Sequence, residues 1–501
     1  MASIKHTLLQ TGGLFAAHSN ANSTVVNTDV IVIGGGASGS HAAVRLTDYG
    51  QDVILIERQP HIVGFPLVAT RHRLPKVCSS FAHKILQLQG GAVNTYTDPV
   101  SGKPYEFGVS FFIEYGNATG FFDRFNIPVS TDVTSPTMHD IYADFKTGQI
   151  LSNYTGPSAA DQLAALETYL AIAEKYEDML IPGYWNFPNA SDIPEDLLVN
   201  FSDFVEKYNF TDALPEMFSS TGLGTGNIMN KLTMPVMQAF GVQMSRILTG
   251  TLSYLTPSSG RNQDLYDAVA RFLGDKVYCN TEAISSTRTD DGVTVTVRNS
   301  VSGQETNINA KKLLIAIEPV ATRLAAFDLD EHEEDVFSKF KFCREYTAIV
   351  TNPSLQTNQS LYYLPYAAND NNFKTFPDFN FTSCFECVDY DSNLFRVDMI
   401  GDERLGPEEA RAMAQSNFET LVKAGTLPAS NQTELKFVAF SSHGPMHDRI
   451  SAEDLKEGFI QDLLGLQGLR STWYTGAAFA SNYQTVLWQY NEILLPQMLA
   501  A

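Results

Sequence analysis

Three glycines near the N-terminus have the spacing that binds the phosphates of a dinucleotide. Gly34, Gly36 and Gly39 follow a β-branched run, Val30–Ile33, and precede residues His41–Leu46, which are predicted to be helical. In such a strand–turn–helix unit, the first glycine permits the tight turn, the second lets the backbone approach the pyrophosphate, and the third allows close helix–strand packing. The helix N-terminus adds oriented N–H groups and a partial positive charge, which attract phosphate.

An acidic residue in the expected place favours the same interpretation. Residues 51–57 contain a second buried run that ends in Glu57, about twenty positions after the glycines. Its carboxylate can accept hydrogen bonds from ribose hydroxyls and would repel a 2′-phosphate, which argues against NADP. Ser38 and Arg58 are further candidates for contact with the cofactor. The alternative is that the glycines only permit a turn.

The C-terminal segment favours FAD over NAD. Residues 470–479 contain an apolar strand that ends at Gly476, and residues 481–495 carry apolar side chains at helical spacing. Together with the N-terminal motif, they resemble the two ends of an FAD domain of the glutathione-reductase type. In that arrangement the dipole of the late helix stabilises negative charge on the reduced flavin, with Thr485 and Val486 as backbone contacts. An ordinary packed terminal helix is the alternative.

A middle block fits the same architecture. Residues 275–284, 292–297 and 310–319 have the pattern of strands, and the last of them ends in a turn. This block resembles the third FAD segment of amine-oxidase-like flavoproteins. The resemblance implies that the backbone near Ala283 contacts the adenine.

With these blocks placed, the chain resembles the fungal beta-cyclopiazonate dehydrogenase family of FAD-dependent oxidoreductases. The resemblance is carried by Gly34–Leu46, Gly91–Pro99, Gly102–Pro104, Gly108-Val109 and Trp473–Gly476. It implies an α/β fold: a discontinuous, Rossmann-like FAD-binding domain with an inserted α+β substrate domain. It also implies a flavin oxidase or dehydrogenase, since some members of the family close rings by removing hydride from a carbon substrate.

The domain division follows from these blocks. We expect a leader at 1–27, FAD-binding parts at 28–115, 256–320 and 436–501, and substrate-domain parts at 116–255 and 321–435. One departure from the family lies in the first FAD-binding part.

Flavoproteins of this kind carry a Gly-Gly pair shortly after the acid that ends the second strand. Here Gly64 and its expected partner Gly91, both candidate cofactor contacts, are separated by residues 65–90. That segment is rich in Lys, Arg and His and contains no acid, in a chain of net charge −22. We interpret it as a retained intron or a mispredicted exon. A genuine basic surface loop is the alternative.

No catalytic residue identifies itself from a motif. In flavin chemistry the cofactor accepts the hydride, so the protein need supply only position, apolar enclosure and one base. His443 and His447 lie shortly before the last FAD segment, and His443 is the candidate catalytic residue, as a base or as a covalent flavin anchor. His41 is interpreted as a packing residue. The dense aromatic residues of 362–381 line a substrate pocket or belong to the core.

Composition limits the partners. The chain of 501 residues has 56 acidic and 34 basic residues, a balance that repels nucleic acid and anionic lipid. No apolar stretch is long enough to span a bilayer. We expect no metal site, and Cys384 and Cys387, in CxxC spacing, form a local disulfide or are free thiols.

Nine Asn residues stand in N-glycosylation sequons, and residues 1–21 contain a weak apolar leader. These features favour the secretory pathway, with a cytoplasmic protein as the alternative. The function expected is that of an FAD-dependent oxidase or dehydrogenase that removes hydride from an apolar small molecule, with O2 as acceptor. A flavin amine or amino-acid oxidase, a redox-neutral flavin isomerase, and a non-catalytic, degraded FAD-fold protein are the alternatives. The sequence leaves the oligomeric state open.

Overall fold

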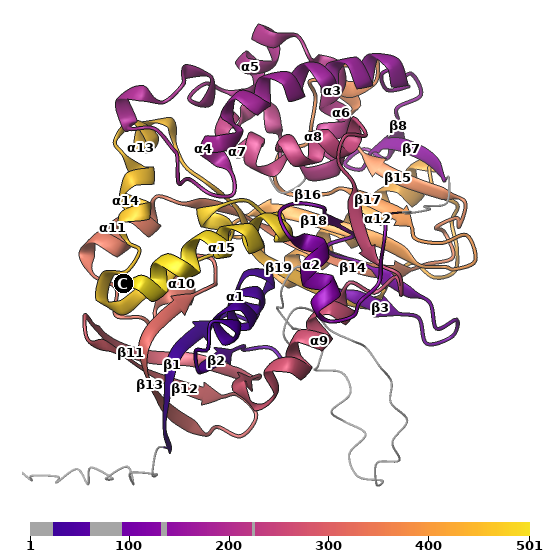
Figure 1. The fold of residues 1–501 in the computed structure, drawn as a ribbon. Coiled ribbons are helices and arrows are strands. Elements are labelled where there is room, and N and C mark those ends of the chain that lie inside the picture. Colours follow the sequence, from indigo (N-terminus) through magenta and orange to yellow (C-terminus); the bar gives the residue numbers. More distant parts are fainter. Residues whose placement is uncertain (1–23, 61–92, 132–137, 223–225) are drawn as a thin grey trace, which may run out of the picture.

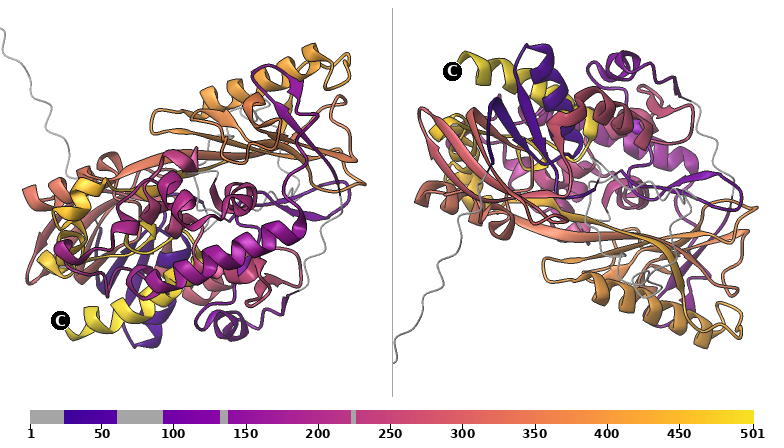
Figure 2. Two further views of the ribbon diagram at one scale, coloured as in Figure 1. Left: turned by 90° about the horizontal axis from the view of Figure 1, so that it is seen from above. Right: turned by 90° about the horizontal axis from the view of Figure 1, so that it is seen from below.

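The computed structural model describes residues 24–60, 93–131, 138–222 and 226–501. Two sheets lie toward opposite ends of the molecule, and a group of helices packs over the region between them (Figures 1 and 2). The first sheet is flanked by the helices α1 and α15, and the second is covered on one face by α12. This is the α/β organisation expected from the sequence.

The first sheet has seven strands in the order β10-β2-β1-β13-β12-β11, with β20 paired to β13. The strands β10, β2, β1, β13 and β20 run parallel, whereas β11, β12 and β13 form an antiparallel meander. Its strands are β1 (Thr24–Ile33), β2 (Val53–Ile56), β10 (Val277–Tyr278), β11 (Thr281–Thr289), β12 (Gly292–Asn299), β13 (Glu305–Ile315) and β20 (Thr472–Tyr474).

Because these strands come from three separate stretches of the chain, the sheet has the discontinuous arrangement that the FAD-binding fold requires. The apolar runs of β1, β2 and the end of β13 are buried on both faces, as in other parallel sheets. Helix α1 (Ala37–Asp48) connects β1 to β2, and α15 (Gln484–Ala500) packs beside α1. The individual domain boundaries given above stay predictions.

The second sheet has eight strands in the order β19-β14-β18-β17-β15-β7-β8, with β16 paired to β18. Its strands are β7 (His139–Asp144), β8 (Gln149–Ile150), β14 (Lys341–Thr351), β15 (Gln359–Tyr363), β16 (Phe381–Thr382), β17 (Cys384–Cys387), β18 (Phe395–Asp402) and β19 (Lys436–Arg449). Helix α12 (Pro407–Ala424) buries Ala410, Ala414, Phe418 and Leu421. The thiols of Cys384 and Cys387 are free and buried in β17, so the disulfide alternative does not hold.

The remaining elements are short. The helices are α2 (Ala118–Arg124), α3 (Ala159–Ala173), α4 (Glu177–Leu180), α5 (Phe201–Tyr208), α6 (Leu214–Met217), α7 (Thr233–Ala239), α8 (Val242–Leu248), α9 (Gln263–Leu273), α10 (Ala321–Leu324), α11 (Glu331–Ser338), α13 (Ala452–Lys456) and α14 (Phe459–Gly465). The other strands are β3 (Thr95–Thr97), β4 (Pro104–Glu106), β5 (Phe112–Ile113), β6 (Val129–Ser130) and β9 (Tyr254–Pro257). In the part of the chain that the structure describes, no helix is long and apolar enough to cross a membrane.

Several of the dense aromatic residues of 362–381 pack in the hydrophobic core, among them Tyr363, Phe376 and Phe381. Tyr363 stacks on Phe145, and Phe376 stacks on Phe218. Tyr366, by contrast, is 48% exposed. These contacts favour the interpretation of this segment as core rather than as the wall of a pocket.

Candidate FAD site

A cavity of about 740 Å³ lies at the carboxyl ends of the parallel strands of the first sheet. Its wall includes the last residues of β1 and β2, Ile33 and Ile56, as well as Ala316 after β13 and Gly476 after β20. In open parallel sheets, ligands bind at this edge, and the volume is in the range of about 300–1,000 Å³ typical of cofactor sites. The cavity contains most of the predicted site residues that the structure describes.

The glycine motif has the geometry that a phosphate-binding turn needs. Gly34 has a φ of +102°, and a Cβ on it would lie 2.7 Å from the carbonyl oxygen of Ala316. A Cβ on Gly39 would lie 1.9 Å from the carbonyl oxygen of Gly34, so helix and turn are in direct contact there. A Cβ on Gly36 would meet no atom within 4 Å, because this position faces the cavity. The space in front of Gly36 and α1 therefore fits a pyrophosphate.

Glu57 lies in the same wall, with both carboxylate oxygens held by the backbone. Oε2 accepts from the N–H of Gly35 and Oε1 from the N–H of Gln59, each at 2.7 Å. Burial raises the pKa of Glu57, an effect that these two N–H groups partly offset. Each carboxylate oxygen has a second lone pair, so the group retains acceptor capacity for ribose hydroxyls.

Of the predicted contacts in the last FAD segment, Gly476 lines the cavity, whereas Thr485 and Val486 are buried in the first turn of α15. Gly476, with φ +126°, lines the cavity directly. Thr485 and Val486 lie in the first turn of α15 and are buried, while Gln484 and Leu487 of the same helix form the cavity wall. The first N–H groups of α15 have no partner within the helix, so the positive end of its dipole is available at this edge.

Ser38 lines the cavity from the first turn of α1, but its side chain turns toward the protein. The Ser38 hydroxyl is 2.7 Å from the Thr475 hydroxyl, which also lies 2.7 Å from Oδ1 of Asn491. The amide of Asn491 donates to the backbone carbonyl of Ser38 at 2.8 Å. What Ser38 offers to a phosphate is therefore its backbone N–H.

Ala283 and Arg58 also line the cavity, beside Glu282 on β11. Sequence reasoning missed Arg323 of α10, a further guanidinium in this wall, which pairs with Glu318. No motif marks it. A pyrophosphate carries negative charge, and Arg58 and Arg323 supply cations on the same wall.

The position of Arg323 depends on the glycine that follows His443. Gly444 has a φ of +77°, and a Cβ on it would lie 2.5 Å from Nη2 of Arg323. A side chain at this position would require the guanidinium to shift. The glycine in Ser442-His-Gly-Pro445 is the one signal in the sequence that relates to this contact.

His443 reaches the cavity because the strand that carries it is irregular. On β14 the consecutive residues Glu345 and Tyr346 pair with Gly444 and Ser442 of β19, so His443 is the extra residue of a β-bulge. Its side chain is 3% exposed and lines the cavity. Nε2 lies 3.2 Å from the Asn94 amide nitrogen, and Nδ1 lies 3.9 Å from Oε1 of Glu345.

Asn94 and Glu345 were not predicted from the sequence. Asn94 precedes the hairpin of β3 and β4, whose Glu106 accepts a hydrogen bond from Thr95 at 2.6 Å. Burial raises the pKa of Glu106 to about 8, so this carboxyl is protonated at neutral pH.

Gly64, Gly91, the segment 65–90 and the side chain of His447 lie outside what the structure describes.

The sheet and the cavity at its edge define a protein with an FAD-binding fold of the kind found in amine oxidases. Among solved structures, the chain is similar to a fatty acid isomerase from P. acnes (TM-score 0.67, 19% identity, covering 94% of this chain and 98% of the other). It is also similar to putrescine oxidase bound to putrescine (TM-score 0.60, 14% identity, covering 95% and 100%). At these identities the likeness establishes the fold.

The chain belongs to the family of fungal FAD-dependent oxidoreductases that includes beta-cyclopiazonate dehydrogenase. It is 31% identical over 495 residues to the FAD-dependent oxidoreductase pigF of Monascus ruber, covering 97% of this chain and 95% of that protein. It is 30% identical over 480 residues to beta-cyclopiazonate dehydrogenase of Aspergillus oryzae, covering 95% and 94%. The profile of the family described as FAD dependent oxidoreductase matches residues 29–104. The protein is an enzyme, and its cofactor is FAD.

Proposed function

We propose that this enzyme removes a hydride and a proton from an apolar small molecule and so forms a new double bond in the product. The proposal rests on one observation: His443 lies in the wall of the cavity that contains the FAD motif. FAD, when bound, supplies the acceptor for the hydride. O2 is proposed as the final electron acceptor, which takes up two electrons and two protons as H2O2.

His443 is proposed as the base. Its ring is held from two sides, by Asn94 at Nε2 and by Glu345 facing Nδ1. A proton taken from the substrate would bind Nε2 in place of the hydrogen bond from Asn94 and give an imidazolium whose Nδ1 lies 3.9 Å from Oε1 of Glu345. Asn94 fixes the orientation of the ring, so the base is positioned before substrate binds.

Apolar residues in the cavity wall support an apolar substrate. Pro445 and Met446 follow the histidine along β19, and Ala477 and Leu487 lie in the same wall. Apolar side chains around a reacting carbon exclude water and strengthen the interaction between His443 and Glu345.

The test is anaerobic reduction of the enzyme-bound flavin, followed by its visible absorbance, with a panel of hydroaromatic and alicyclic compounds. With an active compound, we expect His443→Gln to keep its flavin and to be reduced about 100- to 10,000-fold more slowly than the unmodified enzyme. The matched control is His332→Gln, which changes an exposed histidine. Equal rates for His443→Gln and the unmodified enzyme would remove His443 from the mechanism.

The same experiment, extended to primary amines and amino acids and followed by product analysis and O2 uptake in air, separates the alternatives. Reduction by primary amines or amino acids only would establish an amine or amino-acid oxidase. Conversion of a compound without net reduction and without O2 uptake would establish an isomerase. Flavin that stays with the acid-precipitated protein would assign a covalent link, and its absence from His443→Gln would place that link at His443.

We also propose that the protein enters the secretory pathway. Eight of the nine sequon asparagines lie in the described part of the chain, and all eight are exposed: Asn117, Asn153, Asn189, Asn200, Asn209, Asn358, Asn380 and Asn431. A glycan on a folded protein needs an exposed asparagine, so the exposure of all eight is compatible with glycosylation. The test is treatment of protein from the native host with a peptide N-glycosidase. An unchanged mass would contradict the proposal.

A further inference from the structure

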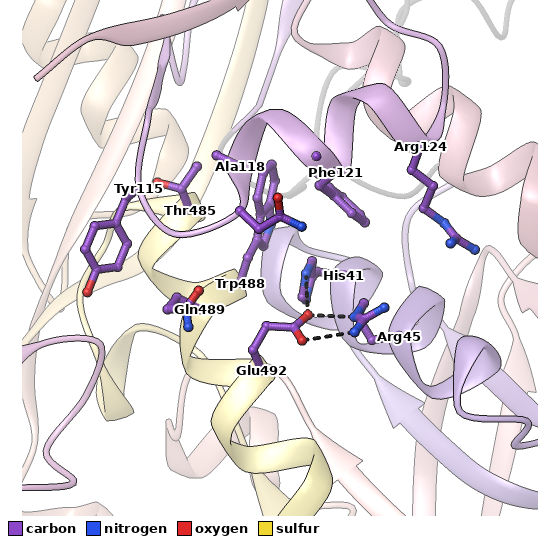
Figure 3. Close-up of a pocket in the computed structure, with 12 residues that line it drawn as sticks. His41, Arg45, Tyr115, Ala118, Phe121, Arg124, Thr485, Trp488, Gln489 and Glu492 are labelled. Atoms are coloured by element: carbon purple, nitrogen blue, oxygen red, sulfur yellow. Dashed lines mark hydrogen bonds and ion pairs between the residues drawn. The ribbon is translucent and has the colours of Figure 1, made fainter.

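A second cavity, of about 450 Å³, lies on the other side of α15 from the FAD site. It is open to solvent on one side and is lined by α1, α2, α15 and the residues that precede α2 (Figure 3). Thr485, Trp488 and Glu492 of α15 face this cavity, whereas Gln484 and Leu487 of the same helix face the FAD site. One helix therefore separates two cavities.

Aromatic rings form one side of the second cavity. The imidazole of His41 lies 4.8 Å from the ring of Phe121 and stacks on the indole of Trp488 at 5.8 Å, with an angle of 8° between the planes. The indole N–H donates to the carbonyl of Ala37, which fixes the ring. Because these rings pack on one another and are almost completely buried, they offer a ligand rigid ring edges rather than free faces.

The charged groups of this cavity already have partners. Arg45 binds Glu492 through two hydrogen bonds, of 2.6 and 3.1 Å, and Arg124 pairs with Asp48 at 2.6 Å (Figure 3 shows the pair of Arg45 and Glu492). Burial lowers the pKa of His41 to about 3, so its ring is neutral at physiological pH. The cavity thus offers no free charge to an ionic ligand.

One polar group in the lining lacks a partner. The hydroxyl of Thr485 is buried and makes no hydrogen bond, although the residue is only 1% exposed. A buried hydroxyl without a partner is costly, and such groups normally pair with protein, water or ligand. The amides of Asn117 and Gln489 lie in the same lining and add further donors and acceptors.

From these contacts we infer that the cavity between α1, α2 and α15 is a second binding site, for a neutral, planar aromatic molecule that carries a hydroxyl or carbonyl group. The rings of Phe121 and Trp488 hold the planar part, and the Thr485 hydroxyl pairs with the polar substituent.

The test measures binding of two probes, 2-naphthol and naphthalene, to the FAD-loaded enzyme by equilibrium dialysis. Protein from a bacterial host is used, since Asn117 is a sequon asparagine in the lining. One neutral hydrogen bond contributes about 0.5–1.5 kcal/mol, so Thr485→Val should bind 2-naphthol about 2- to 12-fold more weakly. Its affinity for naphthalene, which has no hydroxyl, should not change.

The matched control is Thr382→Val, which removes another buried hydroxyl without a partner, on β16. It should bind both probes like the unmodified enzyme. Ala118→Leu, which fills the cavity from α2, should abolish binding of both probes while the flavin is retained. The anion 2-naphthoate should bind more weakly than 2-naphthol.

Three results would overturn the inference. The first is equal affinity of Thr485→Val and the unmodified enzyme for 2-naphthol, which would place the probe elsewhere or leave only water beside the hydroxyl. The second is an equal loss in Thr382→Val. The third is loss of FAD from Thr485→Val, which would assign the hydroxyl to the cofactor. Since none of these measurements uses a redox substrate, their outcome is independent of the proposed reaction.

Discussion

The hydroxyl oxygens of Ser38 and Thr475 lie 2.7 Å apart, although the residues are 437 positions apart in the sequence. Ser38 belongs to the first turn of the phosphate-binding helix, and Thr475 precedes the glycine of the last FAD segment. Asn491 of α15 bonds to both. This buried contact joins the first and last FAD segments at the edge where the cofactor binds.

Replacing Asn491 should therefore loosen that junction. Asn491→Leu removes one hydrogen bond each from the Ser38 carbonyl and the Thr475 hydroxyl, at a cost of about 0.5–1.5 kcal/mol for each bond. We expect a lower midpoint of thermal unfolding and weaker retention of FAD on dialysis. Asn372→Leu, at an exposed asparagine, is the control. An unchanged midpoint would mean that these two groups find other partners.

The glycines of the motif should respond differently to the same added methyl group. Gly39→Ala should destabilise the protein even without cofactor, because the Cβ would lie 1.9 Å from the carbonyl oxygen of Gly34. Gly36→Ala should leave the unfolding of the apoprotein unchanged and weaken FAD binding at least about tenfold, since its Cβ meets only the cavity. Titration of both apoproteins with FAD decides this. Normal affinity in Gly36→Ala would show that the pyrophosphate does not approach there.

Glu57→Gln tests the ribose contact. The amide lacks the charge of the carboxylate, and its NH2 group would face one of the N–H donors of Gly35 and Gln59. Hydrogen bonds to charged groups contribute about 1.5–3 kcal/mol, so FAD affinity should fall about 10- to 150-fold. Glu305→Gln, at an exposed carboxylate on β13, is the control and should bind FAD normally. A retained affinity in Glu57→Gln would remove the carboxylate from the site.

Acid should destabilise the protein through His41. Burial, with a smaller contribution from Arg45, lowers the pKa of His41 from 6.5 to about 3. Between these pH values the unfolded chain binds a proton that the folded chain excludes. The contribution of His41 to the free energy of unfolding is therefore fully present above pH 6.5 and falls as the pH is lowered from 6.5 toward 3. The slope is at most about 1.4 kcal/mol per pH unit.

The measurement compares the pH dependence of unfolding of the unmodified protein with that of His41→Gln. We expect the variant to be less stable at pH 7, where it loses packing, but to depend less on pH below 6.5. His332→Gln, at an exposed histidine, should keep the original slope. Parallel curves for all three proteins would show that another group controls the acid transition.

Local features of the sequence determined the first half of the FAD site. The apolar runs, the glycine spacing and Glu57 predict a strand, a turn, a helix and a second strand, and the structure has them as β1, α1 and β2. Such predictions succeed because a turn with φ > 0 and a close helix–strand contact depend on residues only a few positions apart. The resemblance of three separate blocks similarly indicated the discontinuous sheet.

Only the tertiary structure decided which distant side chains share the cavity. His443 reaches the wall through a β-bulge, and Arg323 reaches it because Gly444 leaves room, neither of which alternation along a strand predicts. Thr485 was expected to contact the flavin through its backbone, and that stays a prediction. Its side chain lines the second cavity, which the sequence did not indicate, because α15 is buried on nearly all sides and its apolar pattern does not fix which side faces the cofactor. Sequence spacing determines contacts within one element, whereas contacts between elements depend on how the whole chain packs.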